Sequence, residues 1–141
     1  MRSHSVVTVA AATLLTTLMG VSTARADVGT AAHYAPPYLP TACYGKDGTR
    51  LPSGGLVAAA GDGVWDGGAA CGRTYQVRCV SAAQPGVCVP GRTIQVEIVD
   101  YAPSSVSPAS ASSTTLVLSD TAFDAVTRRT AESITIEFQE V

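Results

Sequence analysis

Three segments of the chain alternate between apolar and polar side chains, and this period of two limits the available folds more than any other feature. In residues 73–80, Tyr75, Val77 and Cys79 fall on one face of an extended strand and polar residues fall on the other. The pattern recurs in residues 93–99 and 133–139. Each segment is predicted to be a strand with one buried and one solvent-facing side. Weaker patterns predict three more strands, at residues 29–34, 56–60 and 115–118.

A single segment is predicted to be helical. Ser119 can cap its N-terminus, and apolar side chains recur at helical spacing at Ala122, Phe123 and Val126. Arg128 and Arg129 are expected to close the helix at the end that favours positive charge. A turn of helix at residues 63–65 is an alternative, but the glycines between residues 61 and 68 favour a loop there. Short strands with one short helix predict an all-β fold, built as a compact barrel.

The N-terminus has the pattern of a secretory signal peptide. Arg2 and His4 precede a mostly apolar stretch over residues 6–21, and Ala24-Arg25-Ala26 forms a small-residue cleavage site. The apolar stretch is shorter than the roughly 20 residues that a spanning helix needs. We therefore expect residues 1–26 to be a signal peptide and residues 27–141 to be one secreted, soluble domain.

All four cysteines, Cys43, Cys71, Cys79 and Cys88, lie in the expected secreted part. An even number of cysteines in an exported chain indicates two structural disulfides, although spacing alone leaves three pairings open. A zinc site is the alternative. It is disfavoured because the chain has no CxxC pair and because His33 lies ten residues before Cys43.

The charge balance limits the partners. Asp and Glu number 11 against 9 Lys and Arg, and no basic cluster is present to bind nucleic acid or an anionic membrane. The chain carries no G-x-S-x-G, HExxH or phosphate-loop motif. No cofactor and no metal are therefore expected.

Several short motifs occur in an order that resembles a known family. They are GTAAHY at residues 29–34, PPY at 36–38, ACYG at 42–45, LVAA at 56–59, WDGGAACGR at 65–73, YQVRC at 75–79, IVDY at 98–101, LS at 118–119 and AF at 122–123. In this order the set resembles the plant natriuretic peptide-like proteins, single-domain relatives of the expansin N-terminal domain. The resemblance covers essentially all of residues 27–141.

The resemblance implies a six-stranded double-psi β-barrel, as in barwin and the family-45 endoglucanases. It also implies the disulfides Cys43–Cys71 and Cys79–Cys88. Family members usually carry further cysteines just after the IVDY motif. Here Ala102 and a Ser-rich stretch stand in their place, and residues 103–115 are expected to form a mobile surface loop open to O-glycosylation.

The resemblance also bears on catalysis. Hydrolytic relatives need a carboxylic acid as proton donor, and in expansins and bacterial lytic transglycosylases of this fold an acidic residue stands immediately before the Leu-Ser that opens the late helix. This chain has Val117 there. Valine cannot protonate a glycosidic oxygen. Asp100 matches an acidic position of the family's groove, and Tyr34 is available to stack on a sugar or to donate a hydrogen bond. The alternatives are that Asp100 satisfies nearby backbone N–H groups and that Tyr34 is barrel packing.

Two other residues could serve a site. Trp65 beside a glycine-rich loop could be a sugar platform, but a core position is favoured for a lone tryptophan near a cysteine. His33 could titrate near neutral pH, yet no acid or nucleophile lies near it in the sequence.

Three functions follow from these observations. The leading one, implied by the resemblance, is a non-catalytic, monomeric protein of the plant cell wall space that acts through a cell-surface receptor on water and ion balance or stress responses. The alternative is a module that binds cell-wall polysaccharide without hydrolysing it. The third is a glycan-cleaving enzyme that uses Asp100 with an unidentified second acid.

Overall fold

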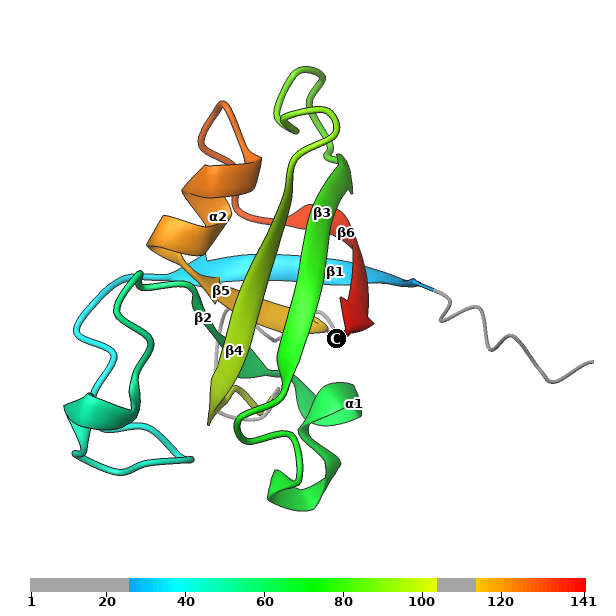
Figure 1. The fold of residues 1–141 in the computed structure, drawn as a ribbon. Coiled ribbons are helices and arrows are strands. Elements are labelled where there is room, and N and C mark those ends of the chain that lie inside the picture. The colour runs from blue at the N-terminus through cyan, green and yellow to red at the C-terminus, as the bar shows by residue number, and fades with distance from the viewer. Residues whose placement is uncertain (1–25, 104–113) are drawn as a thin grey trace, which may run out of the picture.

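The structure is a computed structural model that describes residues 26–103 and 114–141. Its six strands close into a barrel in the order β1-β5-β2-β4-β3-β6 (Figure 1). The strands are β1 (Asp27–Tyr34), β2 (Val57–Ala60), β3 (Thr74–Ser81), β4 (Thr93–Tyr101), β5 (Leu116–Ser119) and β6 (Ile134–Glu140). All six predicted strands are therefore present, with bounds that differ by at most two residues at either end.

Two parallel pairs give the barrel its topology. Strand β1 runs parallel to β5, and β2 runs parallel to β4, whereas the other four neighbouring pairs are antiparallel. The pairing of β2 with β4 shifts register between Ala58 and Ala59. This is the double-psi β-barrel expected from the sequence, and that prediction is confirmed.

The inward faces of the strands form the main core. The alternation seen in the sequence is retained, because Tyr75, Val77 and Cys79 point inward from β3. Ile98 from β4 and Leu118 from β5 are fully buried in the same cluster. Burial of such apolar side chains contributes about 1.5–3 kcal/mol each for a fully buried valine, leucine or isoleucine.

Helix α2 (Asp120–Val126) covers one end of this core. The Ser119 hydroxyl oxygen accepts a hydrogen bond from the Ala122 N–H at 3.1 Å, so the predicted N-cap is present. The prediction for the C-terminal end was wrong, since the helix stops at Val126 and Arg128 and Arg129 lie beyond it. The reason is tertiary: the backbone on either side of Thr127 pairs instead with residues 87–89 of the β3–β4 connection.

The glycine-rich stretch is more ordered than a simple loop. Helix α1 (Asp62–Trp65) and the 3-10 turn η2 (Asp66–Gly68) follow β2, on the side of the barrel away from α2 (Figure 1). A further 3-10 turn, η1 (Gly48–Arg50), lies between β1 and β2. Gly61 is required where α1 begins, because a Cβ there would lie 2.2 Å from the Thr114 carbonyl oxygen.

Two disulfides tie the loops to the barrel. Cys43 is joined to Cys71, and Cys79 is joined to Cys88, which is the pairing that the resemblance implies. The first holds the β1–β2 connection against the segment after η2. The second closes the base of the β3–β4 connection.

Two predictions concern residues outside the described ranges. The expected signal peptide, residues 1–26, lies outside the described residues except for Ala26, and most of the expected Ser-rich loop lies in residues 104–113. In the described part of the chain, no helix has the length and apolar character needed to cross a membrane.

Candidate functional site

One outer face of the barrel brings together three of the residues that the sequence singled out, Tyr34, Asp100 and Val117. Cross-strand pairing places Ala32 of β1 beside Val117 of β5, Val117 beside Ala59 of β2, and Ala59 beside Asp100 of β4. These four positions form one continuous row across four strands. Tyr34 lies two residues further along β1, and Ala102 follows directly after the end of β4. We call these six residues, Ala32, Tyr34, Ala59, Asp100, Ala102 and Val117, the Tyr34 face.

The floor of the Tyr34 face is small and apolar. Ala32, Ala59, Ala102 and Val117 form a second hydrophobic cluster, separate from the main core, and Tyr34 packs against it. The Val117 side chain is only 3% exposed. The position where hydrolytic relatives are expected to keep their acid is therefore a buried hydrocarbon in the middle of the row.

The Tyr34 hydroxyl is the unusual polar group of this face. It is buried and makes no hydrogen bond to any residue in the described part of the chain. Burial raises the pKa of Tyr34 well above its usual value, and the nearby Asp100 carboxylate and Tyr38 raise this pKa further. Leaving a buried hydroxyl unpaired costs free energy, so a group that could bond to it would be bound favourably.

Asp100 has structural partners. Its Oδ1 atom accepts hydrogen bonds from the backbone N–H groups of Ala42 and Tyr101, each at 2.9 Å. The carboxylate therefore anchors the segment around Ala42 to the end of β4. This matches the alternative in which Asp100 satisfies backbone donors.

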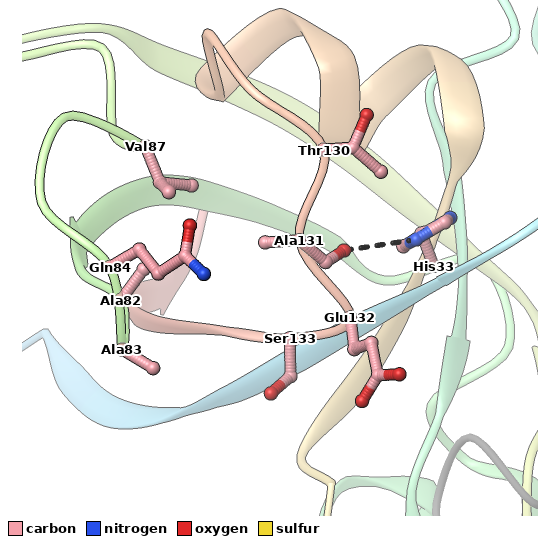
Figure 2. Close-up of a pocket in the computed structure, with 9 residues that line it drawn as sticks. All are labelled: His33, Ala82, Ala83, Gln84, Val87, Thr130, Ala131, Glu132 and Ser133. Atoms are coloured by element: carbon pink, nitrogen blue, oxygen red, sulfur yellow. Dashed lines mark hydrogen bonds between the residues drawn. The ribbon is translucent and has the colours of Figure 1, made fainter.

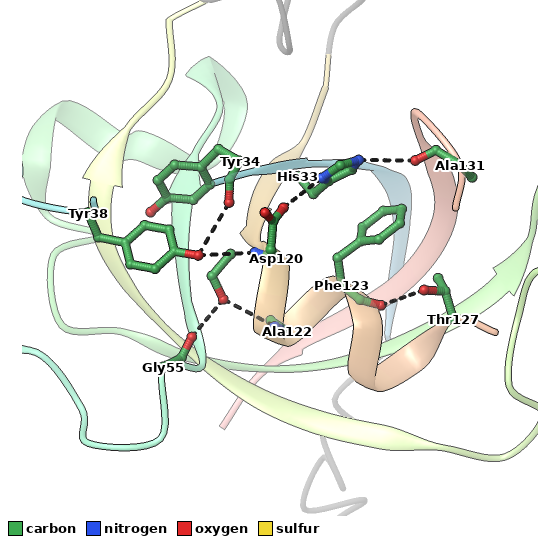
Figure 3. A network of polar contacts seen from close by, with 10 residues as sticks. His33, Tyr34, Tyr38, Gly55, Asp120, Ala122, Phe123, Thr127 and Ala131 are labelled. Carbon is green, nitrogen blue, oxygen red and sulfur yellow. Dashed lines mark hydrogen bonds and ion pairs between the residues drawn. The ribbon is translucent and has the colours of Figure 1, made fainter. Parts of the chain in front are cut away.

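Tyr38 extends the aromatic part of this face, although its position in the sequence did not point to a role. Its ring meets the Tyr34 ring edge to face, with the centroids 4.9 Å apart (Figure 3). Its hydroxyl donates to the Tyr34 carbonyl oxygen at 3.4 Å and accepts from the Asp120 N–H at 3.2 Å. The PPY motif at residues 36–38 was the available signal, since it places a tyrosine just after β1.

His33 does have an acidic partner, although none is near it in the sequence. Its Nδ1 atom lies 2.7 Å from Oδ1 of Asp120, and its Nε2 atom lies 3.2 Å from the Ala131 carbonyl oxygen (Figure 3). Its ring also packs against Phe123, with the centroids 4.5 Å apart. The alternation of β1 could have indicated this, because it directs His33 and Tyr34 to opposite faces.

Trp65 is a half-buried residue that packs against the main core. Its ring stacks on Tyr101 with the centroids 4.6 Å apart and 9° between the planes. The Tyr101 hydroxyl in turn donates to the Asp62 carboxylate. These contacts favour the interpretation of Trp65 as a packing residue over that of an open sugar platform.

A separate pocket of about 460 Å³ lies beside His33, between the β3–β4 connection and the segment before β6 (Figure 2). Gln84, Val87, Ala131 and Glu132 are among the residues that line it, whereas Tyr34 and Asp100 are not. In the described ranges, no three His, Cys, Asp or Glu side chains are grouped so that they could hold a metal ion.

Comparison with known proteins agrees with this geometry. Residues 57–138 match the family model described as lytic transglycolase. An EG45-like domain containing protein of Citrus jambhiri is 36% identical over 123 residues, which cover 84% of this chain and 85% of the relative. The chain belongs to the EG45-like domain family. The expected expansin-like single domain is thereby confirmed.

Solved structures with the same fold include binding proteins and enzymes. A mutant expansin of Clavibacter michiganensis in complex with cellohexaose superposes on the EG45-like domain with a TM-score of 0.59 at 21% identity, covering 83% of this chain. The EG45-like domain spans half the length of that expansin chain. A β-1,4-D-endoglucanase of the blue mussel Mytilus edulis gives a TM-score of 0.54 at 16% identity, covering 82% of this chain and 79% of the enzyme. Such low identities establish the shared barrel alone.

Proposed function

We propose that the protein is a secreted, non-catalytic domain that binds a β-1,4-linked glucan chain on the Tyr34 face. The observation that carries the proposal is the buried Val117 in the middle of the row that ends at Asp100. Glycoside hydrolysis needs a carboxylic acid to protonate the leaving oxygen, commonly with a second carboxylate. With valine at this position, the face lacks the proton donor that hydrolysis needs.

The chemistry of the Tyr34 face suits a sugar. Pyranose rings offer apolar C–H faces and a rim of hydroxyl groups, so they are held by aromatic rings and by a few fixed polar atoms. Tyr34 and Tyr38 supply the aromatic rings, the small side chains of the row supply an apolar floor, and Asp100 supplies an acceptor. A sugar hydroxyl could pair with the Tyr34 hydroxyl, which has no partner in the described chain. The cellohexaose complex of the structurally similar expansin supports a glucan as the ligand class.

Binding and turnover can be tested together. We expect the protein to bind cellohexaose in calorimetry and to be retained on cellulose, while releasing no new reducing ends over long incubation. Tyr34→Phe is expected to weaken binding several-fold because it removes the hydroxyl that would pair with the sugar. Arg92→Ala, on the exposed β3–β4 connection, is the matched control and should bind as the wild type does.

Two results would contradict the proposal. Absence of binding to cellohexaose, cellulose, xylan and pectin would remove the glycan as ligand. Release of oligosaccharides that is lost in Asp100→Asn would show that the domain is an enzyme after all.

The resemblance to natriuretic peptide-like proteins supports a second role, in signalling. In this role the secreted monomer would act through a cell-surface receptor on water and ion balance or stress responses, and the similarity to a Citrus protein favours a plant setting. Purified protein should then change ion flux or protoplast volume. A lack of effect, together with a lack of binding to plant membranes, would exclude this role.

A further inference from the structure

Three arginines lie at the end of the barrel that α2 covers (Figure 1). Arg92 ends the β3–β4 connection, and Arg128 and Arg129 lie in the connection between α2 and β6. Hydrogen bonds join the two connections, since the Arg128 N–H donates to the Val87 carbonyl oxygen at 2.7 Å. The Arg92 N–H donates to the Val89 carbonyl oxygen at 3.4 Å, within the same β3–β4 connection. Arginines that are far apart in the sequence are thereby held on one surface, which we call the arginine surface.

The positive charges of the arginine surface are not neutralised. Its three side chains are exposed, and none of them forms an ion pair with a residue in the described ranges. By contrast, Arg73 and Arg78 form ion pairs, and Arg50 lies over an aromatic ring. The acidic residues on the adjoining segments are Asp124 of α2 and Glu132 before β6. Free positive charge therefore collects at this end of a chain in which 11 acidic residues outnumber 9 basic ones.

The pocket beside His33 lies between the same two connections (Figure 2). Its volume of about 460 Å³ is within the range of small-ligand sites. Gln84, Thr130 and Ser133 contribute an amide and two hydroxyl groups to its lining, and alanines and a valine contribute apolar surface. Glu132 is its acidic residue, and its carboxylate points away from Gln84 in Figure 2. Neutral polar groups beside an apolar wall suit a sugar ring.

An acidic polysaccharide fits this combination better than an anionic membrane does. Basic segments that hold proteins to membranes commonly carry about 4–8 lysines and arginines, and surface helices add large apolar side chains that enter the lipid. The exposed large apolar side chains of the described residues are Val28, Val80 and Val141, none of them aromatic. A chain of uronic acids instead repeats a carboxylate on hydroxyl-rich rings. The guanidinium group can hold a carboxylate through two parallel hydrogen bonds.

We propose that the arginine surface and the adjacent pocket form a second binding site, whose ligand is an acidic polysaccharide built from uronic acids. Carboxylates of the chain pair with Arg92, Arg128 and Arg129, while one sugar ring enters the pocket and bonds to Gln84. This site is separate from the Tyr34 face and goes beyond the function proposed for that face. Cellohexaose carries no charge, so Arg92→Ala remains a valid control for binding at the Tyr34 face.

Polygalacturonate is the probe, and its methyl ester is the matched ligand, because it has the same sugar without the charge. We expect the full-length secreted protein to bind polygalacturonate at low ionic strength and to bind the methyl ester at least tenfold more weakly. Raising the salt concentration from about 0.01 M to about 1 M shortens the Debye length roughly tenfold and should release the polygalacturonate. Binding that is equal for the two ligands, or that resists salt, would exclude the arginine surface as the determinant.

Paired variants locate the site. Arg128→Gln/Arg129→Gln should weaken polygalacturonate binding about tenfold to thirtyfold at low ionic strength, as expected for two basic residues near an anionic surface. Lys46→Gln/Arg50→Gln removes two exposed charges from the β1–β2 connection and should weaken binding less than about twofold. Thermal unfolding of both variants checks that each remains folded. Equal losses in the two variants would show that binding follows net charge and not this surface.

The pocket and the rival partner have tests of their own. Gln84→Ala should weaken polygalacturonate binding roughly three- to tenfold, whereas Gln76→Ala, an exposed glutamine on β3, should leave it unchanged. No loss in Gln84→Ala would remove the pocket from the site. Sedimentation with vesicles of phosphatidylserine and phosphatidylcholine tests the membrane. Tighter binding to these vesicles than to polygalacturonate, lost in Arg128→Gln/Arg129→Gln, would overturn the assignment of a polysaccharide.

Discussion

Val117 and Asp100 occupy the same cross-strand row of the barrel, separated only by Ala59. Neighbouring strands lie about 4.8 Å apart, so two strand spacings place the two backbones roughly 10 Å from each other. Glycoside hydrolases commonly use two carboxyl groups that flank the scissile bond. Here Asp100 shares its row with a valine, and no carboxyl group stands at position 117.

Val117→Asp tests whether water is excluded from this position. Burial should raise the pKa of the new carboxyl, so the folded state would bind its proton more tightly than the unfolded state. We expect a loss of about 1–3 kcal/mol in the free energy of unfolding at pH 7, most of it recovered at pH 4, where the carboxyl is neutral. Urea unfolding at the two pH values measures this, with Val117→Thr as the neutral control of similar size. Equal stability of the two variants at pH 7 would show that water reaches the row.

Replacing each tyrosine of the site by phenylalanine should have opposite effects on stability. Tyr34→Phe removes a buried hydroxyl that has no partner in the described chain, so stability should stay constant or rise by up to about 1 kcal/mol. Tyr38→Phe removes the acceptor of the Asp120 N–H and should cost about 0.5–1.5 kcal/mol. Thermal and urea unfolding of the two variants provide the comparison. A clear loss of stability in Tyr34→Phe would show that its hydroxyl is already bonded.

The raised pKa of Tyr34 predicts sensitivity to alkali. An unfolded tyrosine ionises near pH 10, whereas burial, Asp100 and Tyr38 keep Tyr34 protonated to higher pH in the folded state. Its contribution to stability is complete below pH 10 and is lost above that value, as the unfolded state releases the proton. One such group can lower the free energy of unfolding by at most about 1.4 kcal/mol for each pH unit. Between pH 9 and 11.5, the free energy of unfolding should fall less steeply with pH in Tyr34→Phe than in the wild type. An unchanged slope would show that Tyr34 does not have a raised pKa in the folded state.

Ser119→Ala should destabilise the junction of β5 and α2. The buried Ser119 hydroxyl accepts from the Ala122 N–H and donates to the Gly55 carbonyl oxygen at 2.6 Å. Alanine removes both bonds, and we expect a loss of about 1–3 kcal/mol in the free energy of unfolding. Ser53→Ala, at an exposed position, should change stability by less than about 0.5 kcal/mol. Similar values for the two variants would mean that neither bond contributes.

Local features of the sequence predicted the strands and the start of the late helix. Alternation of apolar residues predicted β3, β4 and β6, because a strand with one buried face imposes a period of two on its own residues. Weaker patterns predicted β1, β2 and β5, and β2 and β5 are buried on both faces. The Ser119 cap could be predicted because its partner Ala122 lies three residues away. The end of α2 was mispredicted because the competing partners of Thr127 and Arg128 lie in residues 87–89, far away in the sequence.

The sequence by itself determined the strands and the start of the late helix, because both depend on residues that are close together in the chain. It also determined that position 117 carries no acid, because this depends on residue identity alone. The tertiary structure alone decided that Val117, Ala59 and Asp100 share a row, and that His33 meets Asp120 across 87 positions. The physical reason is that barrel closure sets strand register and helix docking, including the register shift in β2. These contacts arise from packing the whole chain at once, and no local pattern encodes them.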